Sequence, residues 1–262
     1  MKTTSKQRDG RLLPLFTLSK GVKMIPLVYD QLNQSTYDTQ FFCTLLKKAN
    51  AKVVADLGCG TGQLTEQFVK EGYQITAIDP NQEALERARK KEIQGSVEWI
   101  LGDSSDLKHH TYDVVIMTSN VAQVFLTSDS WKQMLLDVYR SLKPGGHLIF
   151  DVRNPLAKVW EEWEQDLSPD YAKHPQSGDD LEILTEYEGF TEDVFTFYES
   201  VKHVPSGEIL QRERLQLRFQ PKEEIDLSLN QVGFDEVHTF GDWQLSPATS
   251  QSKTLIYMYV KK

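Results

Sequence analysis

The chain has few cysteines, no long apolar run and no excess of positive charge, and each absence argues against a class of protein. Only Cys43 and Cys59 occur among its 262 residues, too few for a disulfide framework and without the Cys/His spacing of a zinc site. No stretch of about 18 uncharged apolar residues is present, which argues against a transmembrane helix and a membrane partner. The start of the chain also lacks the apolar run of a signal peptide. We therefore expect a cytoplasmic protein that binds no metal.

The negative charge of the chain is unevenly distributed. The formal net charge is −9, yet residues 1–25 contain six basic side chains and one acidic side chain, Asp9. Recognition of nucleic acid depends on lysine and arginine, so the acidic body disfavours such a partner. The basic segment leaves two alternatives open, because it could bind an anionic partner or be a frayed terminus.

Between residues 35 and 155, short apolar runs alternate with amphipathic segments. Strands are predicted at 53–57, 74–79, 97–101, 114–117 and 147–152, and helices at 36–49, 63–71, 80–91 and 130–142. This alternation predicts a parallel sheet with helices on both faces. A helix and an antiparallel strand pair, 236–240 and 253–260, follow Pro221. The expected fold is α/β: a Rossmann-like, doubly wound, mostly parallel sheet of seven strands, with its ligand at the carboxyl ends of the strands.

The pattern changes after Pro155. We predict a helix over 156–167, a polar loop over 168–180, and strands over 181–190, 193–204 and 208–219 that form a small antiparallel β insert. The chain therefore divides into three parts. Residues 1–34 form an N-terminal arm and lid segment, 35–155 with 221–262 form the Rossmann-like domain, and 156–220 form the insert. We expect the insert to be a substrate lid, and it offers a surface for oligomerisation.

The strongest chemical signal is the segment VVADLGCGTG at residues 53–62. A buried strand runs into Gly58, Gly60 and Gly62, and a helix follows. Glycines allow a sharp turn and close approach of a ligand, and the helix start offers free N–H groups. A dinucleotide-binding loop would have glycine or alanine at position 63. Gln63 stands there, which disfavours a nicotinamide-dependent dehydrogenase.

With Asp56 before the glycines, this segment resembles motif I of the class I S-adenosylmethionine-dependent methyltransferases. Further pieces agree in order along residues 53–155: Ile78-Asp79-Pro80, Gly102-Asp103-Ser104-Ser105-Asp106-Leu107, Tyr112-Asp113-Val114-Val115 and Leu142-Lys143-Pro144-Gly145-Gly146-His147-Leu148. The insert and Gly241-Asp242-Trp243 are similar to the sugar N-methyltransferases. Gln123, however, stands where several of those have a histidine.

The resemblance implies a set of residues that bind S-adenosylmethionine. They are Asp56, Gly58, Cys59, Gly60, Gly62, Asp79, Pro80, Asp103, Ser104 and Ser119. In this set Asp56 would meet the ammonium group of the donor, Asp79 the ribose hydroxyls and Asp103 the adenine amino group. The alternative role for Asp79 is that of a helix N-cap.

Three residues are candidates on the acceptor side: Tyr29, Asn120 and Gln123. Tyr29 lies in the segment Val28-Tyr29-Asp30, where the resemblance implies a flap over the cofactor. Its ring suits a sulfonium through cation–π attraction, or it packs as a hydrophobic anchor. Asn120 and Gln123 follow a strand end, so they are substrate contacts or ordinary cap and loop residues.

The resemblance implies transfer of a methyl group from S-adenosylmethionine, with S-adenosylhomocysteine as product, to a small-molecule acceptor at nitrogen or oxygen. In-line transfer depends mainly on positioning, so no catalytic triad is expected. Two alternatives stay open. One is an RNA or protein methyltransferase that uses the basic arm, and the other is a cofactor-binding module without catalysis.

Overall fold

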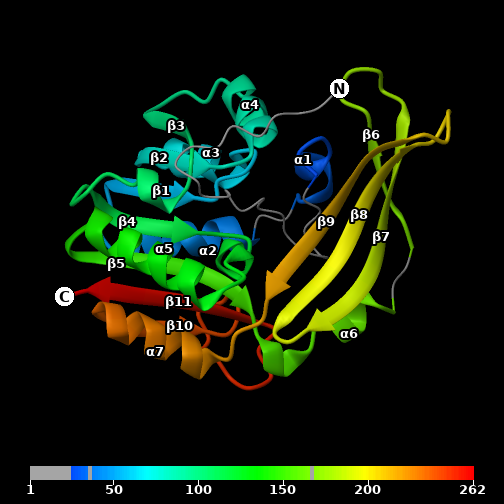
Figure 1. Ribbon diagram of the computed structural model, residues 1–262. Helices are drawn as coiled ribbons and strands as arrows, with labels where there is room; N and C mark the ends of the chain where they lie inside the picture. The colour runs from blue at the N-terminus through cyan, green and yellow to red at the C-terminus, as the bar shows by residue number, and fades with distance from the viewer. Residues whose placement is uncertain (1–24, 35–36, 166–167) are drawn as a thin grey trace.

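A seven-stranded sheet forms the centre of the molecule, in the order β10-β11-β5-β4-β1-β2-β3 (Figure 1). The strands are β1 Val53–Leu57, β2 Gln74–Asp79, β3 Val97–Leu101, β4 Tyr112–Met117, β5 Leu142–Arg153, β10 Phe234–Phe240 and β11 Thr254–Lys261. Strands β1 to β5 pair in parallel, while β11 runs antiparallel to both β5 and β10. The computed structural model describes residues 25–34, 37–165 and 168–262. The predicted sheet is therefore confirmed, whereas nearly all of the basic segment 1–25 lies outside the described residues.

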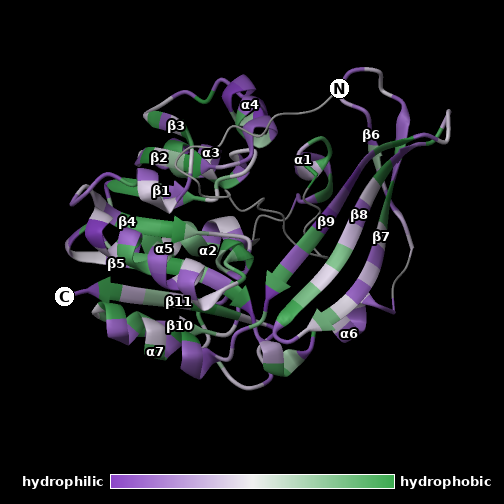
Figure 2. Ribbon diagram, in the orientation of Figure 1, coloured by the Kyte–Doolittle hydropathy of each residue, from purple (hydrophilic) through white to green (hydrophobic). Residues whose placement is uncertain are grey.

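Helices cover both faces of this sheet. They are α2 Tyr37–Lys48, α3 Gln63–Lys70, α4 Gln82–Lys90, α5 Ser128–Ser141 and α7 Lys222–Val232. Helices α5 and α7 pack against one face, and α2 and α3 pack against the other. Successive strand residues point to opposite faces, so Phe150 joins the α5 side and Ile149 the α2 side. Apolar colouring dominates β4, while the covering helices show polar and apolar residues together (Figure 2). Within the described ranges, no helix has both the length and the apolar character needed to cross a bilayer.

A second, antiparallel sheet has the order β6-β7-β8-β9 and stands beside the first (Figure 1). Its strands are β6 Asp170–Lys173, β7 Asp180–Thr191, β8 Val194–His203 and β9 Ile209–Arg218. Phe195, Phe197 and Leu217 of this sheet belong to the same buried cluster as the α5 side of the main sheet. The two sheets therefore share one hydrophobic core.

Two predictions in this region are wrong. The expected helix over 156–167 is only a 3-10 turn, Pro155–Ala157, and a one-turn helix, α6 Trp160–Trp163. Lys158 between them has a left-handed backbone, with φ of 47°, and this conformation breaks a right-handed helix. The expected loop over 168–180 contains β6, whose partner is β7. A four-residue strand is formed by pairing with its neighbour rather than by a local pattern.

A short helix, α1 Tyr29–Leu32, lies between the two sheets (Figure 1). Ile25 and Val28, just before it, pack with Leu181, Ile183 and Val201 of the second sheet in a small separate cluster. The segment at the start of the described chain is thereby anchored to the insert.

Replacing Phe150 tests how much the shared hydrophobic core contributes to stability. Its ring is fully buried, stacks on Tyr257 with 4.8 Å between ring centroids and lies edge-on to Trp131. Phe150→Ala should lower the free energy of unfolding by about 3–5 kcal/mol, because the truncation leaves a cavity. Urea denaturation measures this loss. The control, Leu136→Ala, removes a side chain that is 38% exposed and should change stability by about 0.5 kcal/mol. Equal losses in the two variants would contradict this account of the core.

Candidate active site

The loop after β1 makes a turn that only glycine accommodates well. Gly58, Gly60 and Gly62 all have positive φ, at 81°, 55° and 74°. A Cβ atom on Gly58 would lie 2.6 Å from the Val121 methyl groups. A Cβ atom on Gly60 would meet nothing within 4 Å. The loop is therefore packed against protein at Gly58 and open at Gly60.

Asp79 at the end of β2 holds this loop in place. Its carboxylate accepts hydrogen bonds from the backbone N–H groups of Gly60, at 2.7 Å, and Asn81, at 2.8 Å. The N-cap of α4 is Asn81, whose side chain accepts from Ala84 N at 3.1 Å. Asn81, and not Asp79, is therefore the N-cap of α4. The Asp79 carboxylate instead binds the backbone of the glycine loop. Burial raises the pKa of Asp79 to about 6, although both N–H groups act to lower it.

Asp56 lies at the base of the loop, near the end of β1. One carboxylate oxygen accepts a hydrogen bond from the Thr65 hydroxyl at 2.5 Å, and the other, Oδ1, is buried without a partner. Burial raises the pKa of Asp56 to about 7. An unpartnered buried acceptor requires an explanation, and a donor group of a ligand would supply one.

A cavity opens at the carboxyl ends of β1, β2 and β4. It holds about 660 Å³ of empty space, part of it open to solvent. Its lining comprises Pro26, Tyr29, Gly58, Cys59, Gly60, Thr61, Gln63, Leu64, Asp79, Asn81, Ala84, Thr118, Ser119 and Val121. Six of these residues are among the predicted site residues: Tyr29, Gly58, Cys59, Gly60, Asp79 and Ser119.

The remaining lining residues were missed for different reasons. Thr61 and Leu64 belong to the glycine segment and its helix, so the motif itself could have identified them. Gln63 was considered only as evidence against a dinucleotide. Pro26 and Thr118 carry no local signal, because their place depends on packing between distant segments. Asp56, Gly62, Pro80, Asp103, Ser104, Asn120 and Gln123 were predicted as site residues, and none of them belongs to the lining.

Asp103 and Ser104 have protein partners. Asp103 caps the 3-10 turn Ser104–Asp106, accepting from Ser105 N at 2.8 Å. Asp106 completes this cap by accepting from Asp103 N at 3.0 Å. Ser104 is buried and donates to Asp137 at 2.9 Å. These contacts shape the end of β3, and the contact between Asp103 and adenine stays a prediction.

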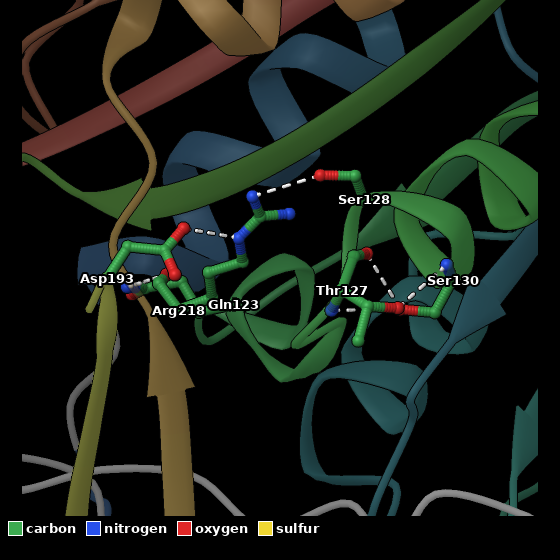
Figure 3. Close-up of polar contacts among 6 residues, drawn as sticks. All are labelled: Gln123, Thr127, Ser128, Ser130, Asp193 and Arg218. Carbon is green, nitrogen blue, oxygen red and sulfur yellow. Dashed lines mark hydrogen bonds and ion pairs between the residues drawn. The ribbon is translucent and has the colours of Figure 1, made fainter. Parts of the chain in front are cut away.

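Gln123 lies in a junction of polar contacts, where its side chain bonds to Arg218 (Figure 3), and it does not line the cavity. Its side chain is 2% exposed and lies on the 3-10 turn Val121–Val124. The amide nitrogen donates to the Arg218 carbonyl at 3.0 Å, and the amide oxygen accepts from Arg153 N at 3.1 Å. Arg218 is itself paired with Asp193 at 2.6 Å. Gln123 therefore joins β5 of the main sheet to β9 of the insert, and its geometry gives no support to the predicted catalytic role.

Ser119 and Asn120 form a strained corner at the end of β4. Both have left-handed backbones, with φ of 56° and 64°, which is costly outside glycine and is frequent at functional sites. The Tyr29 side chain is hydrogen-bonded to Ser119, and burial raises the pKa of its phenol well above the usual range. Tyr29 therefore faces the cavity as a neutral phenol.

Helix α1 closes this side of the cavity through contacts to three elements. Asp30 accepts from the Thr61 hydroxyl at 2.6 Å and pairs with Lys91 at 2.7 Å. Gln31 exchanges two hydrogen bonds with the backbone of Lys173 in β6, at 2.8 and 2.9 Å. The helix thus connects the glycine loop, the end of α4 and the insert.

Neither a metal nor a thiol nucleophile is indicated at this site. In the part of the chain that the structure describes, no group of three His, Cys, Asp or Glu side chains could hold a metal ion. Cys59 lines the cavity, but burial raises the pKa of its thiol well above its ordinary value. A protonated thiol is a poor nucleophile.

Comparison with known proteins agrees with this geometry. Residues 54–146 match the protein family described as methyltransferase domain. The fold is similar to that of S-adenosylmethionine-bound CalS10, an amino pentose methyltransferase from Micromonospora echinaspora, with a TM-score of 0.65 and 18% identity. The alignment covers 90% of this chain and 95% of CalS10. The family match and the shared fold support a class I S-adenosylmethionine-dependent methyltransferase.

Two curated methyltransferases show how far the similarity in sequence extends. The putative methyltransferase YqeM of Bacillus subtilis (strain 168) is 27% identical over 240 residues, which cover 88% of this chain and 93% of YqeM. The cypemycin N-terminal methyltransferase of Streptomyces sp is 33% identical over 107 residues. That second match spans 40% of this chain and only 44% of the cypemycin enzyme. The similarity to the cypemycin enzyme therefore concerns less than half of either protein.

Replacing Gln123 tests whether its role is structural. Gln123→Ala should lower the free energy of unfolding by about 1–3 kcal/mol, because the Arg218 carbonyl and the Arg153 N–H lose their buried partner. Affinity for S-adenosylhomocysteine, measured by calorimetry, should stay within about twofold of the unsubstituted protein, because Gln123 does not line the cavity. A large loss of affinity with unchanged stability would instead place Gln123 in the site.

The raised pKa of Asp79 predicts how methyltransferase cofactor binding depends on pH. A ligand hydroxyl can donate to the ionised carboxylate, and protonation below about pH 6 removes the negative charge that strengthens this hydrogen bond. Affinity for S-adenosylhomocysteine should therefore fall as the pH is lowered through 6, by up to about tenfold per pH unit. Asp79→Asn should bind weakly at every pH and lose much of this dependence.

The matched control for this titration is Asp235→Asn. Asp235 is a partly exposed carboxylate on β10 that pairs with Lys262 at 2.9 Å. This variant should reproduce the pH dependence of the unsubstituted protein. If Asp79→Asn did the same, another group would control the titration, and Asp56 with its pKa of about 7 would be the next candidate.

Proposed function

We propose that this protein transfers the methyl group of S-adenosylmethionine to a small-molecule acceptor, at nitrogen or oxygen. The observation that carries the proposal is the cavity in which the open glycine loop, Asp79 and Tyr29 meet. Its place at the carboxyl ends of parallel strands is where ligands of such sheets bind.

The residues around the cavity fit the proposed donor. Asp79 has an acceptor for ribose hydroxyls, and the absence of a side chain at Gly60 lets a ligand approach the backbone closely. The unpartnered Oδ1 of Asp56 lies below the loop, where it suits the ammonium group of the donor, directly or through water. Asp103 stays the candidate for the adenine amino group. When bound, this donor supplies an electrophilic methyl carbon on a sulfonium.

The chain itself would position the reactants and exclude water. The neutral Tyr29 phenol offers an electron-rich ring beside the cavity, which favours a cationic centre. Contacts of Asp30 with Thr61 and Lys91 hold α1 over the opening. Alignment of the acceptor behind the methyl group can supply much of the acceleration, with effective molarities on the order of 10⁵–10⁸ M in model systems.

The contacts of α1 support a small acceptor. Tyr29 of this helix lines the cavity, and Gln31 joins the helix to β6 of the insert, so we assign the lid role to residues 25–34 and to the insert. CalS10 is an amino pentose methyltransferase, and the cypemycin enzyme is an N-terminal methyltransferase. A cytoplasmic location and oligomerisation through the insert stay predictions. The basic segment that would support an RNA or protein acceptor lies almost wholly outside the described residues.

The decisive experiment compares ligands and variants by titration calorimetry. S-adenosylmethionine and S-adenosylhomocysteine should bind with micromolar dissociation constants, and NADH should not bind. Gly58→Ala should abolish binding, because its Cβ would collide with Val121 at 2.6 Å. Methyl transfer from the labelled donor to an acceptor pool should accompany binding. Binding without any transfer would favour a cofactor-binding module.

The matched control for Gly58→Ala is Gly72→Ala. Gly72 also has a positive φ, of 93°, but a Cβ there would meet nothing within 4 Å. The two variants share the backbone strain, so only Gly58→Ala should lose the ligand. NADH binding, or full affinity in Gly58→Ala, would contradict the proposed function.

A further inference from the structure

Two buried oxygen atoms at the end of β4 and β5 have no hydrogen-bond partner. They are Oδ1 of Asp151 and Oδ1 of Asn120, on side chains that are 1% and 8% exposed. The two residues are joined, since the Asn120 backbone N–H donates to the other Asp151 oxygen at 3.1 Å. Buried acceptors of this kind normally accept a hydrogen bond. A ligand that carries hydrogen-bond donors could therefore satisfy both oxygen atoms.

The pair adjoins the cavity at Ser119, on different elements from Asp79 and Gly60. Asn120 stands between Ser119 and Val121, which both line the cavity. Tyr29, another lining residue, is hydrogen-bonded to Ser119 and is close enough to Asp151 to be affected by its charge. Asp79 and the open Gly60, in contrast, belong to β2 and the glycine loop. Asp151 and Asn120 therefore lie next to the side of the cavity that Tyr29 and Ser119 form.

The charged side chains that act on Asp151 are Asp38 and Arg153. Asp38 on α2 adds a second negative charge, while Arg153 on the same strand adds a positive one. The Arg153 guanidinium is hydrogen-bonded to Gln123 at 3.3 Å and stacks over Trp163 at 5.0 Å. Tyr29 on α1 is neutral. A cationic ligand would therefore be attracted to the carboxylates of Asp151 and Asp38.

The hydrogen-bonding capacity of Asp151 and Asn120 favours a methyl acceptor that reacts at nitrogen. A carboxylate oxygen and an amide oxygen can only accept hydrogen bonds. An amino or ammonium group offers two or three N–H donors to satisfy both, whereas a hydroxyl offers one. The left-handed backbones of Ser119 and Asn120 hold this corner in a costly conformation, as is frequent where a ligand is clamped.

We propose that Asp151 and Asn120 bind the amino group of the methyl acceptor and that Asp151 removes its proton. This inference rests on the proposed function and narrows its acceptor to an amine. The ammonium gives one proton to the Asp151 carboxylate, which leaves a neutral amine with a lone pair. That nitrogen forms a bond to the methyl carbon while the carbon–sulfur bond breaks, and the electron pair stays on sulfur. The product is a methylated ammonium and a neutral thioether, and the Asp151 proton returns to solvent.

The ionisation of Asp151 suits this role. Burial raises its pKa to about 7, the Asn120 N–H and Arg153 act to lower it, and Asp38 acts to raise it. A base whose pKa lies near the working pH is the most efficient. Asp151 can therefore accept a proton and release it under neutral conditions.

The test uses matched pairs of acceptors with labelled S-adenosylmethionine. The probes are 2-phenylethylamine with 2-phenylethanol, glucosamine with glucose, and glycine with glycolate. Transfer should occur only to amine members. Asp151→Asn should lower kcat/KM for the best amine by about 10²-fold or more and leave S-adenosylhomocysteine affinity within about twofold. In the unsubstituted protein kcat/KM should fall below about pH 7, and Asp151→Asn should instead follow the pKa of the amine.

Asn120→Gly is the second variant, because glycine relieves the left-handed backbone while it removes the amide oxygen. It should be at least as stable as the unsubstituted protein and raise KM for the amine more than it lowers kcat. Asp235→Asn, away from the cavity, is the control and should change neither constant.

The outcomes separate this inference from the proposed function. If S-adenosylhomocysteine binds but only hydroxyl probes, or no probes, are methylated, the amine assignment is overturned. Full amine activity in Asp151→Asn with an unchanged pH profile would also overturn it. If neither S-adenosylmethionine nor S-adenosylhomocysteine binds, the proposed function itself fails.

Discussion

The active site depends on one tight turn between the ends of β1 and β2. The backbone N–H groups of Gly58 and Cys59 both donate to the Ile78 carbonyl, at 2.7 and 3.2 Å, and the Gly60 N–H reaches Asp79 one residue further on. The first strand therefore cannot continue past Leu57, and the chain must turn at the carboxyl end of the strand. This turn creates the space above the strand ends and sets where α3 begins. A side chain at Gly58 would displace Val121 and, with it, the corner that carries Asn120.

Around this turn the site divides into two buried acidic centres. Asp56 and Asp151 both lie near the ends of parallel strands, are almost fully buried, and have one oxygen without a partner. In each case burial disfavours the charged form, and local hydrogen bonds only partly compensate for it. A cationic ligand beside either carboxylate would relieve this penalty. In our proposals, a buried carboxylate with an unpartnered oxygen therefore binds each reactant: Asp56 binds the methyl donor, and Asp151 binds the methyl acceptor.

Local pattern was sufficient for the main sheet and the glycine loop, because alternating apolar runs and glycines act over a few residues. It failed where a residue's role depends on distant partners. Gln123 is hydrogen-bonded to the Arg218 carbonyl, 95 positions away. No residue pattern near position 123 predicts that contact. Strand β6 likewise exists only through β7. Asp151 did leave a signal, since an acidic residue stands within the apolar strand Ile149-Phe150-Asp151-Val152. Asn120 is a predicted acceptor-side residue, but its contact with Asp151 became visible only in three dimensions.

The two hydrogen bonds between Gln31 and Lys173 have a meaning beyond the active site. Strand β6 is at the edge of the small sheet, and the Gln31 amide occupies its outer backbone groups much as a neighbouring strand would. Exposed strand edges are templates for pairing with other chains. A movement of α1 away from the cavity would therefore uncover such an edge, so that access to the site and exposure to self-association would rise together.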